Sequence, residues 1–257
     1  MTKRRHKPVT EIMTRGTTMQ KILGKMRRAI EDYEMLHDND RIALGISGGK
    51  DSLIMLIAFS RLKKFLPVKF ELEAVTIDLG FKDFNTEPIR KLCQELEVNY
   101  TVEKTNIFEV VSSRGTQGQA SCSFCANMRR GALDNAALKL NCTKVALAHH
   151  NDDVINTSIM SLFYTGSFHT FGPVTWMDRK KLHVIRPMIY VKESEIADAA
   201  ASISGGLTIV KNPCPNDSST SRAFIKDTIS DLQKKIPDIK SSIFSSIKDS
   251  GVEGWHR

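Results

Sequence analysis

Short apolar runs alternate with segments of helical periodicity through the middle of the chain. The apolar runs predict strands at residues 42–46, 70–78, 100–103 and 145–149. Helices are predicted at residues 53–59, 87–96 and 154–164, with further helical patterns between. Because strands and helices alternate along the chain, the pattern predicts an α/β fold built from parallel βαβ units with right-handed crossovers.

Two further segments frame this alternation. A helix is predicted at residues 19–36, and the polar break Asp38-Asn39-Asp40 separates it from the first strand. Residues 165–181 contain glycines, a proline and mixed charge, which predict an irregular excursion before the apolar residues 183–185. Such an excursion would suit a loop that faces a substrate.

The chain is expected to divide into three parts. Near its end, the polar run at residues 216–221 offers N-caps for a helix at 222–235, and Pro237 starts a last helical segment. The three parts are a basic arm and helix at residues 1–39, an α/β domain with a CxxC insertion at 40–210, and a third-cysteine segment with C-terminal helices at 211–257.

A glycine-rich turn joins the first strand to the helix after it. Its residues are Ser47, Gly48, Gly49, Lys50, Asp51 and Ser52. Paired glycines let backbone N–H groups approach an anion, and the free amides and dipole of a new helix favour negative charge there. A Walker A loop is excluded, since that motif needs four residues between its glycines and Ser or Thr after its Lys. The turn resembles instead the pyrophosphate loop of the N-type ATP pyrophosphatases; an ordinary glycine-rich turn is the alternative.

Acidic and imidazole groups follow two other predicted strands. His149 ends the fourth strand, and Asp152 and Asp153 open the helix after it, while Asp78 ends the second strand. Ligands of parallel sheets bind beyond the carboxyl ends of the strands. The two aspartates are therefore expected to hold Mg²⁺ or assist proton transfer, and Asp78 to contact ribose or adenine. Helix capping and turn formation are the structural alternatives.

Composition fits one large α/β domain with extensions. The chain has 257 residues, of which 41% are hydrophobic, enough to fill a core. No apolar run approaches the roughly 20 residues that cross a bilayer, and the N-terminus lacks the apolar segment of a secretory signal. We expect a cytoplasmic protein with no membrane partner.

The formal net charge of +8 is concentrated near the N-terminus. Residues 1–30 contain one acid, Glu11. The bases there are Lys3, Arg4, Arg5, Lys7, Arg15, Lys21, Lys25, Arg27 and Arg28. Such an arm fits attraction to a nucleic-acid backbone, with a solvated tail as the alternative.

Five cysteines are irregularly spaced, which argues against a disulfide framework and for metal or redox chemistry. Cys122 and Cys125 form a CxxC pair followed by two arginines, and Cys214 lies between two prolines that fix its backbone. Three rigidly held thiols could bind three irons of a cubane cluster and leave the fourth open. A redox pair with a structural cysteine is the alternative, and Cys93 and Cys142 are expected to be structural.

Five ordered motifs together resemble the tRNA 2-thiocytidine synthetases. They are SGGKDS at 47–52, CSFCANMRRG at 122–131, ALAHHNDD at 146–153, VIRP at 184–187 and PCP at 213–215. The resemblance runs from about residue 19 to 249 and implies a Rossmann-like PP-loop ATP pyrophosphatase domain. It further implies that Cys122, Cys125 and Cys214 ligate a [4Fe-4S] cluster.

The resemblance implies ATP- and Mg²⁺-dependent transfer of sulfur to a cytidine at position 32 of the tRNA anticodon loop. Adenylation would make the C2 oxygen a leaving group, and sulfide held on the open iron would replace it. Gly48, Gly49 and Lys50 would bind the phosphates, with Ser47, Asp51 and Ser52 positioning ATP or Mg²⁺ and Asp78 and His149 completing the nucleotide site. Lys50, Asp51, Asp152 and Asp153 are the catalytic candidates.

The implied partners are tRNA and a sulfur donor, either a cysteine desulfurase persulfide or sulfide, and a homodimer is considered. Three alternatives stay open. The related 2-thiouridine synthetases share the loop and three cysteines but usually add zinc-binding cysteine pairs, which this chain lacks. Lysidine synthetases and amide-forming ATP pyrophosphatases do not need the cysteines. A non-catalytic iron–sulfur RNA-binding sensor is the third alternative.

Overall fold

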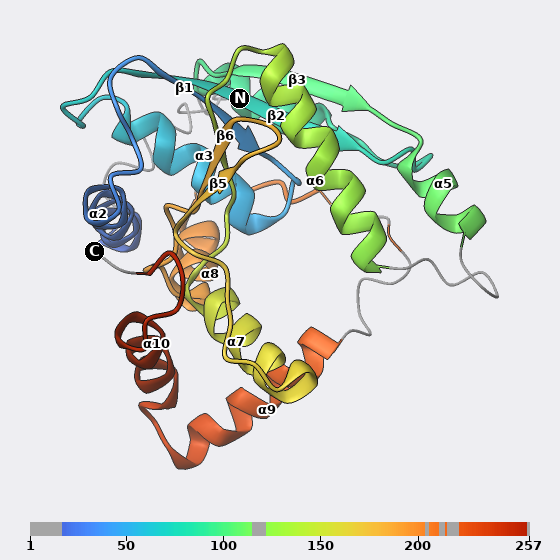
Figure 1. Cartoon of the computed structure of the whole chain (residues 1–257). Coiled ribbons are helices and arrows are strands. Elements are labelled where there is room, and N and C mark those ends of the chain that lie inside the picture. Colours follow the sequence, from blue (N-terminus) through green and yellow to red (C-terminus); the bar gives the residue numbers. More distant parts are fainter. Residues whose placement is uncertain (1–16, 115–121, 204–205, 211–213, 215–220, 256–257) are drawn as a thin grey trace, which may run out of the picture.

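The computed structural model describes residues 17–114, 122–203, 206–210, 214 and 221–255. A six-stranded sheet of order β3-β2-β1-β4-β6-β5 forms its centre (Figure 1). The strands are β1 (Asp40–Gly45), β2 (Phe70–Asp78), β3 (Asn99–Lys104), β4 (Lys144–Ala146), β5 (Val174–Met177) and β6 (Leu182–Ile185). All pairs are parallel except β5 with β6. The predicted α/β fold with a mainly parallel sheet is confirmed.

Helices cover both faces of the sheet. One face carries α2 (Thr17–Asp32), α3 (Lys50–Leu62), α4 (Glu87–Glu95) and α8 (Glu193–Ser202). The other carries α6 (Cys122–Lys139), against which α5 (Ile107–Arg114) packs. Along β1, Ile42 and Leu44 enter the first apolar cluster while Ala43 enters the second. Both faces are therefore buried, which is why the strand reads as a continuous apolar run.

Three helices form a separate group below the sheet in the view of Figure 1. They are α7 (Asn151–Thr165), α9 (Ser221–Lys235) and α10 (Ile239–Asp249), and each contacts the other two. Ile155 of α7 packs with Ile225 and Ile229 of α9, and all three side chains are buried. The C-terminal helices are thus fixed to the helix that follows β4. Within the described residues, no helix has both the length and the apolar character needed to span a membrane.

The helix α2 belongs to the α/β body. Its residues Ile22 and Met26 are fully buried in the largest apolar cluster, and α2 contacts α3 and α8. The division of the chain into three parts stays a prediction. Residues 1–16 of the basic arm, the prolines beside Cys214 and most of the polar run at 216–221 lie outside the described residues.

Three sequence predictions were wrong in detail. The first helix ends at Asp32, four residues early, because the chain turns through Glu34, whose φ is +46°. The fourth strand ends at Ala146 rather than at residue 149. The expected excursion at 165–181 contains β5, whose Val-Thr-Trp sequence favours a strand and pairs with β6. The CxxC of the expected insertion opens the helix α6, and its description as an insertion stays a prediction.

Candidate functional site

The loops after β1 and β4 meet where the strand order of the sheet reverses. These two strands are adjacent and parallel, although the chain proceeds from β1 to β2 on one side and reaches β4 on the other. Ligands of open α/β sheets bind in the crevice at such a switch point. Residues 47–52 follow β1, and the first turn of α7 contains Asp152 and Asp153. Both predicted clusters therefore lie at one edge of the sheet.

The turn from β1 into α3 is closed by its own hydroxyl groups. Ser52 Oγ accepts a hydrogen bond from the Ser47 N–H at 3.2 Å and donates one to the Gly49 carbonyl at 2.9 Å. Gly48 has φ +84°, and a Cβ there would lie 2.7 Å from Cβ of Val210, so only glycine fits. Gly49 is the N-cap of α3 and has no side chain to cap it. The helix N-terminus thus remains available to an anion.

Lys50 lies in the first turn of α3 between two carboxylates. Its Nζ is 3.1 Å from Oδ1 of Asp51 and 3.2 Å from Oε1 of Glu193. Burial lowers the pKa of Lys50, but the two carboxylates outweigh burial and the pKa is raised overall. Asp51 Oδ1 is buried and has no hydrogen-bond partner in the described part of the chain. A fixed ammonium is thus ion-paired with a carboxylate oxygen that accepts no aligned hydrogen bond in the described residues, a pair suited to phosphate and a divalent cation.

His150 is buried among three of the carboxylates. Its Nε2 lies 3.4 Å from Oδ2 of Asp153 and 4.0 Å from Oδ1 of Asp51, and its Nδ1 lies 3.9 Å from Oδ2 of Asp152. Asp153 Oδ2 also accepts the backbone N–H of His150 at 3.1 Å, so this carboxylate caps α7. The imidazole therefore links the aspartate after the phosphate turn with those after β4.

Asp152 is held by groups from the C-terminal half of the chain. Its Oδ1 accepts from Lys240 Nζ at 2.7 Å, and its Oδ2 accepts from the Glu193 N–H at 2.8 Å. Burial raises the pKa of Asp152, but these two hydrogen bonds outweigh burial and the pKa is lowered. The ionised carboxylate thus ties α7 to α8 and α10.

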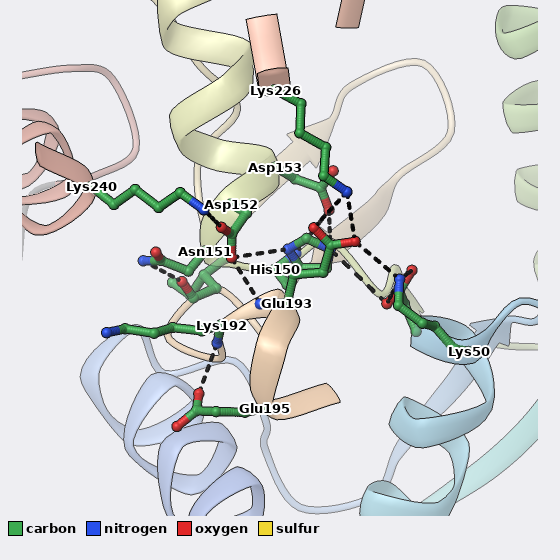
Figure 2. A network of polar contacts seen from close by, with 12 residues as sticks. Lys50, His150, Asn151, Asp152, Asp153, Lys192, Glu193, Glu195, Lys226 and Lys240 are labelled. Carbon is green, nitrogen blue, oxygen red and sulfur yellow. Dashed lines mark hydrogen bonds and ion pairs between the residues drawn. The ribbon is translucent and has the colours of Figure 1, made fainter. Parts of the chain in front are cut away.

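Glu193 and Lys226 complete the polar network in Figure 2. Glu193, the first residue of α8, accepts from Lys50 and, at 2.9 Å, from Lys226 of α9. Burial raises the pKa of Glu193, but the hydrogen bonds from Lys226 and Lys50 outweigh it, and the pKa is lowered. Sequence patterns do not single out either residue, because Glu193 is 143 positions from Lys50 and only the fold brings them together. Arg222 joins the network through Asp153 at 3.5 Å.

Asp78 and His149 lie at the same edge of the sheet but have internal contacts. Asp78 Oδ1 accepts the Gly80 N–H at 2.9 Å, so the turn-forming alternative is observed. The His149 ring stacks on Phe171 with ring centroids 4.7 Å apart. Burial, followed by the charges of Arg186 and Arg222, lowers the pKa of His149 to about 3, so its imidazole is neutral. Roles for both residues in nucleotide binding stay predictions.

The cysteines divide into two groups by burial. Cys93 and Cys142 are buried in the core, and burial raises the pKa of the first to about 12 and of the second to about 11. Cys122 is exposed at the start of α6, whereas Cys125, one turn later, and Cys214 are half-buried. Burial raises the pKa of Cys125, and the Cys214 and Cys122 thiols raise it further against the lowering effect of Arg129. Cys125 is therefore close enough to each of the other two thiols for their charges to affect its pKa.

Across the described residues, no group of three or more His, Cys, Asp or Glu side chains is arranged to hold a metal ion. The structure thus places Cys125 within electrostatic range of Cys122 and Cys214, without assembling the three thiols into a ligand set. What fits a cluster is the donor chemistry, because cysteine thiols are the side chains that ligate iron–sulfur clusters.

Comparison with known proteins extends these observations. A family model described as a PP-loop domain matches residues 18–232. A tRNA-cytidine(32) 2-sulfurtransferase from Pelobacter propionicus is 35% identical over 224 residues, which cover 86% of this chain and 82% of that protein. One from Syntrophotalea carbinolica is 34% identical over 231 residues, covering 89% and 87%. The solved structure of the U34-tRNA thiolase NcsA from Methanococcus maripaludis, with its [4Fe-4S] cluster, has a TM-score of 0.72 at 25% identity and covers 92% of this chain and 80% of that one.

Proposed function

The chain belongs to the tRNA-cytidine(32) 2-sulfurtransferases, a family of PP-loop proteins, and on this premise we propose that it catalyses ATP-dependent thiolation of tRNA. The reaction replaces the C2 oxygen of cytidine 32 in the anticodon loop with sulfur. The observation that carries the proposal is the glycine-rich turn at the switch point, with Lys50 fixed beside Asp51, in a chain with these relatives. The target base lies in a single-stranded loop, where bases are readily splayed out.

The phosphate turn binds ATP for adenylation of the C2 oxygen. Backbone amides near Gly48 and Gly49, together with Lys50, bind the phosphates and offset the charge that develops as pyrophosphate leaves. Ser47 and Ser52 keep the turn closed through their mutual hydrogen bonds.

The carboxylates beside the turn complete this nucleotide site. Asp51, whose Oδ1 is buried without a hydrogen-bond partner in the described residues, fits a Mg²⁺ ligand. When bound, Mg²⁺ neutralises charge on the phosphate oxygens. Asp152 and Asp153 are further groups for the metal or for proton transfer, and Asp78 and His149 contact the nucleoside.

Cys122, Cys125 and Cys214 hold a [4Fe-4S] cluster in this proposal. The electrostatic contact of Cys125 with the other two thiols and the basic residue Arg129 support that ligand set. When bound, the cluster supplies an open iron for the transferred sulfur. The chain's own contribution is to leave the fourth position without a cysteine, since Cys93 and Cys142 are buried in the core.

The partners follow from the same reaction. The donor of sulfur is sulfide or the persulfide of a cysteine desulfurase, the basic arm attracts the tRNA backbone, and the protein acts in the cytoplasm as a homodimer. A tRNA substrate and the five free cysteines of the chain support the reducing location.

The test is a reconstituted reaction without oxygen. Cluster-loaded protein, an unmodified tRNA transcript, ATP, Mg²⁺ and sulfide are combined, and digested nucleosides are analysed by mass spectrometry. We expect 2-thiocytidine, with AMP and pyrophosphate as co-products, and none from a transcript that carries uridine at position 32. Absence of both thionucleoside and AMP would contradict the proposal. A 2-thiouridine product would favour the second candidate function, which rests on the likeness to the U34-tRNA thiolase.

A further inference from the structure

One oxygen of Glu193 bridges two lysines from distant parts of the chain. Its Oε1 lies 3.2 Å from Nζ of Lys50 in α3 and 2.9 Å from Nζ of Lys226 in α9. Figure 2 shows both side chains reaching this carboxylate from opposite sides. Two ammonium groups that share one anionic oxygen mark a place where negative charge is favoured. The place is beside the phosphate turn.

Lys226 has capacity beyond this contact. An ammonium group has three N–H donors, and the contacts of Lys226 are to the two oxygens of one carboxylate. Its side chain is 54% exposed, whereas that of Lys50 is 30% exposed. The ammonium of Lys226 therefore keeps donor capacity and exposed surface for a ligand.

The position of Lys226 is built into the fold. Its neighbour Ile225 is fully buried, and Ile229, one turn later, packs with it against Ile155 of α7. The helix α7 is in turn the one that carries Asp152 and Asp153. The lysine therefore stands on a helix whose apolar face is fixed to the site, unlike a mobile surface side chain.

We infer that Lys226 is a second phosphate-binding cation of the ATP site and that Glu193 is a positioning residue that holds Lys226 and Lys50 for the β- and γ-phosphates. This inference rests on the proposed function. When the cytidine O2 bonds to the α-phosphorus, the bond from that phosphorus to the bridging oxygen breaks, and its electron pair stays with pyrophosphate. Negative charge thus accumulates on the departing pyrophosphate. Lys50 and Lys226 bind this pyrophosphate more tightly as its charge grows.

The test compares Lys226→Met with the matched control Lys234→Met. Lys234 lies on the same helix, pairs with Asp231 at 2.7 Å, and is 74% exposed. Binding of ATP, pyrophosphate and AMP is measured by calorimetry on the full chain. We expect Lys226→Met to weaken ATP and pyrophosphate binding about tenfold and to leave AMP binding unchanged, since AMP lacks the β- and γ-phosphates, while the control binds all three as wild type does.

Equal ATP affinity in Lys226→Met and wild type would overturn the inference, as would a matching loss of AMP binding. Failure of the wild-type protein to bind ATP would instead contradict the proposed function, so the two failures are distinguishable. Glu193 is tested by a double-mutant cycle. Lys226→Met should cost less ATP affinity in a Glu193→Ala background than in wild type, and additive effects would refute the positioning role.

Discussion

The backbone N–H of Val210 donates a 3.0 Å hydrogen bond to the carbonyl of Gly48. This contact joins the phosphate turn to the chain segment that leads toward Cys214. One backbone pair thus joins the segment proposed to bind ATP to the segment that precedes the third proposed cluster ligand. The closeness of that pair also explains why position 48 tolerates no side chain.

Replacing Gly48 by Ala should abolish ATP binding and lower thermal stability by about 1 to 3 kcal/mol. The new Cβ would meet Val210 at 2.7 Å in a left-handed conformation at φ +84°. Gly24→Ala is the matched control, because its Cβ would meet nothing within 4 Å and alanine favours the helix α2. Calorimetric titration with ATP and thermal melts check both; wild-type ATP affinity in Gly48→Ala would contradict the steric argument.

Replacing Asp51 by Asn should stop AMP formation and leave the fold intact. The change preserves side-chain volume but removes the anionic oxygen that has no hydrogen-bond partner in the described residues. Release of AMP and pyrophosphate in the presence of tRNA is the measurement, with circular dichroism as the check on folding. Normal turnover in this variant would remove Asp51 from the mechanism.

Replacing Cys122, Cys125 or Cys214 by Ser should each remove the iron–sulfur chromophore and all thiolation while ATP still binds. These thiols are exposed or half-buried and can reach a metal, whereas Cys93 and Cys142 are buried in the core. Cys93→Ala and Cys142→Ala should keep the chromophore and the activity. Iron counting after anaerobic reconstitution decides the matter, and a full cluster in Cys214→Ser would refute the three-thiolate site.

Stability should fall as pH drops below about 6.5, in part because His149 resists protonation. Its folded pKa is about 3, whereas an unfolded histidine titrates near 6.5, so the unfolded chain takes up a proton that the folded chain does not. The contribution of neutral His149 to the free energy of unfolding is complete above pH 6.5 and is lost as the pH falls toward 3. Between pH 7 and pH 5, this contribution to the free energy of unfolding falls by roughly 1 to 2 kcal/mol. Urea unfolding of His149→Gln should show a smaller loss over that interval; an equal loss would assign the pH dependence to other groups.

The phosphate turn was predictable because its information is local. The sequence from Ser47 to Ser52 sits directly between an apolar strand and an apolar helix, so both the turn and its neighbours could be placed. The parallel sheet was predictable for the same reason, since the alternation of strands and helices can be read from neighbouring residues. The strand β5 was missed because Gly172 and Pro173 precede it and suggest a loop. Its regular conformation depends on pairing with β6, which the sequence around β5 does not reveal.

The network around Lys50 was not predictable, because its members are set by tertiary structure. Glu193 opens α8, a short helix that no expected segment included, and Lys226 lies on the exposed side of an amphipathic helix. Nothing near either residue in the chain distinguishes it from a solvated surface charge. Asp153, by contrast, could be placed from the sequence. Helix capping was the structural alternative for this residue, and its carboxylate does cap α7 while lying 3.4 Å from His150 in the site.

The contacts of Lys226 and Lys240 with Glu193 and Asp152 also bear on how the protein is made. The phosphate turn is synthesised before the lysines Lys226 and Lys240, which lie in α9 and α10. A chain still attached to the ribosome therefore holds an incomplete nucleotide pocket until α10 has emerged. If Lys226 binds phosphate as inferred above, truncated products that end before it would keep the turn but bind ATP more weakly.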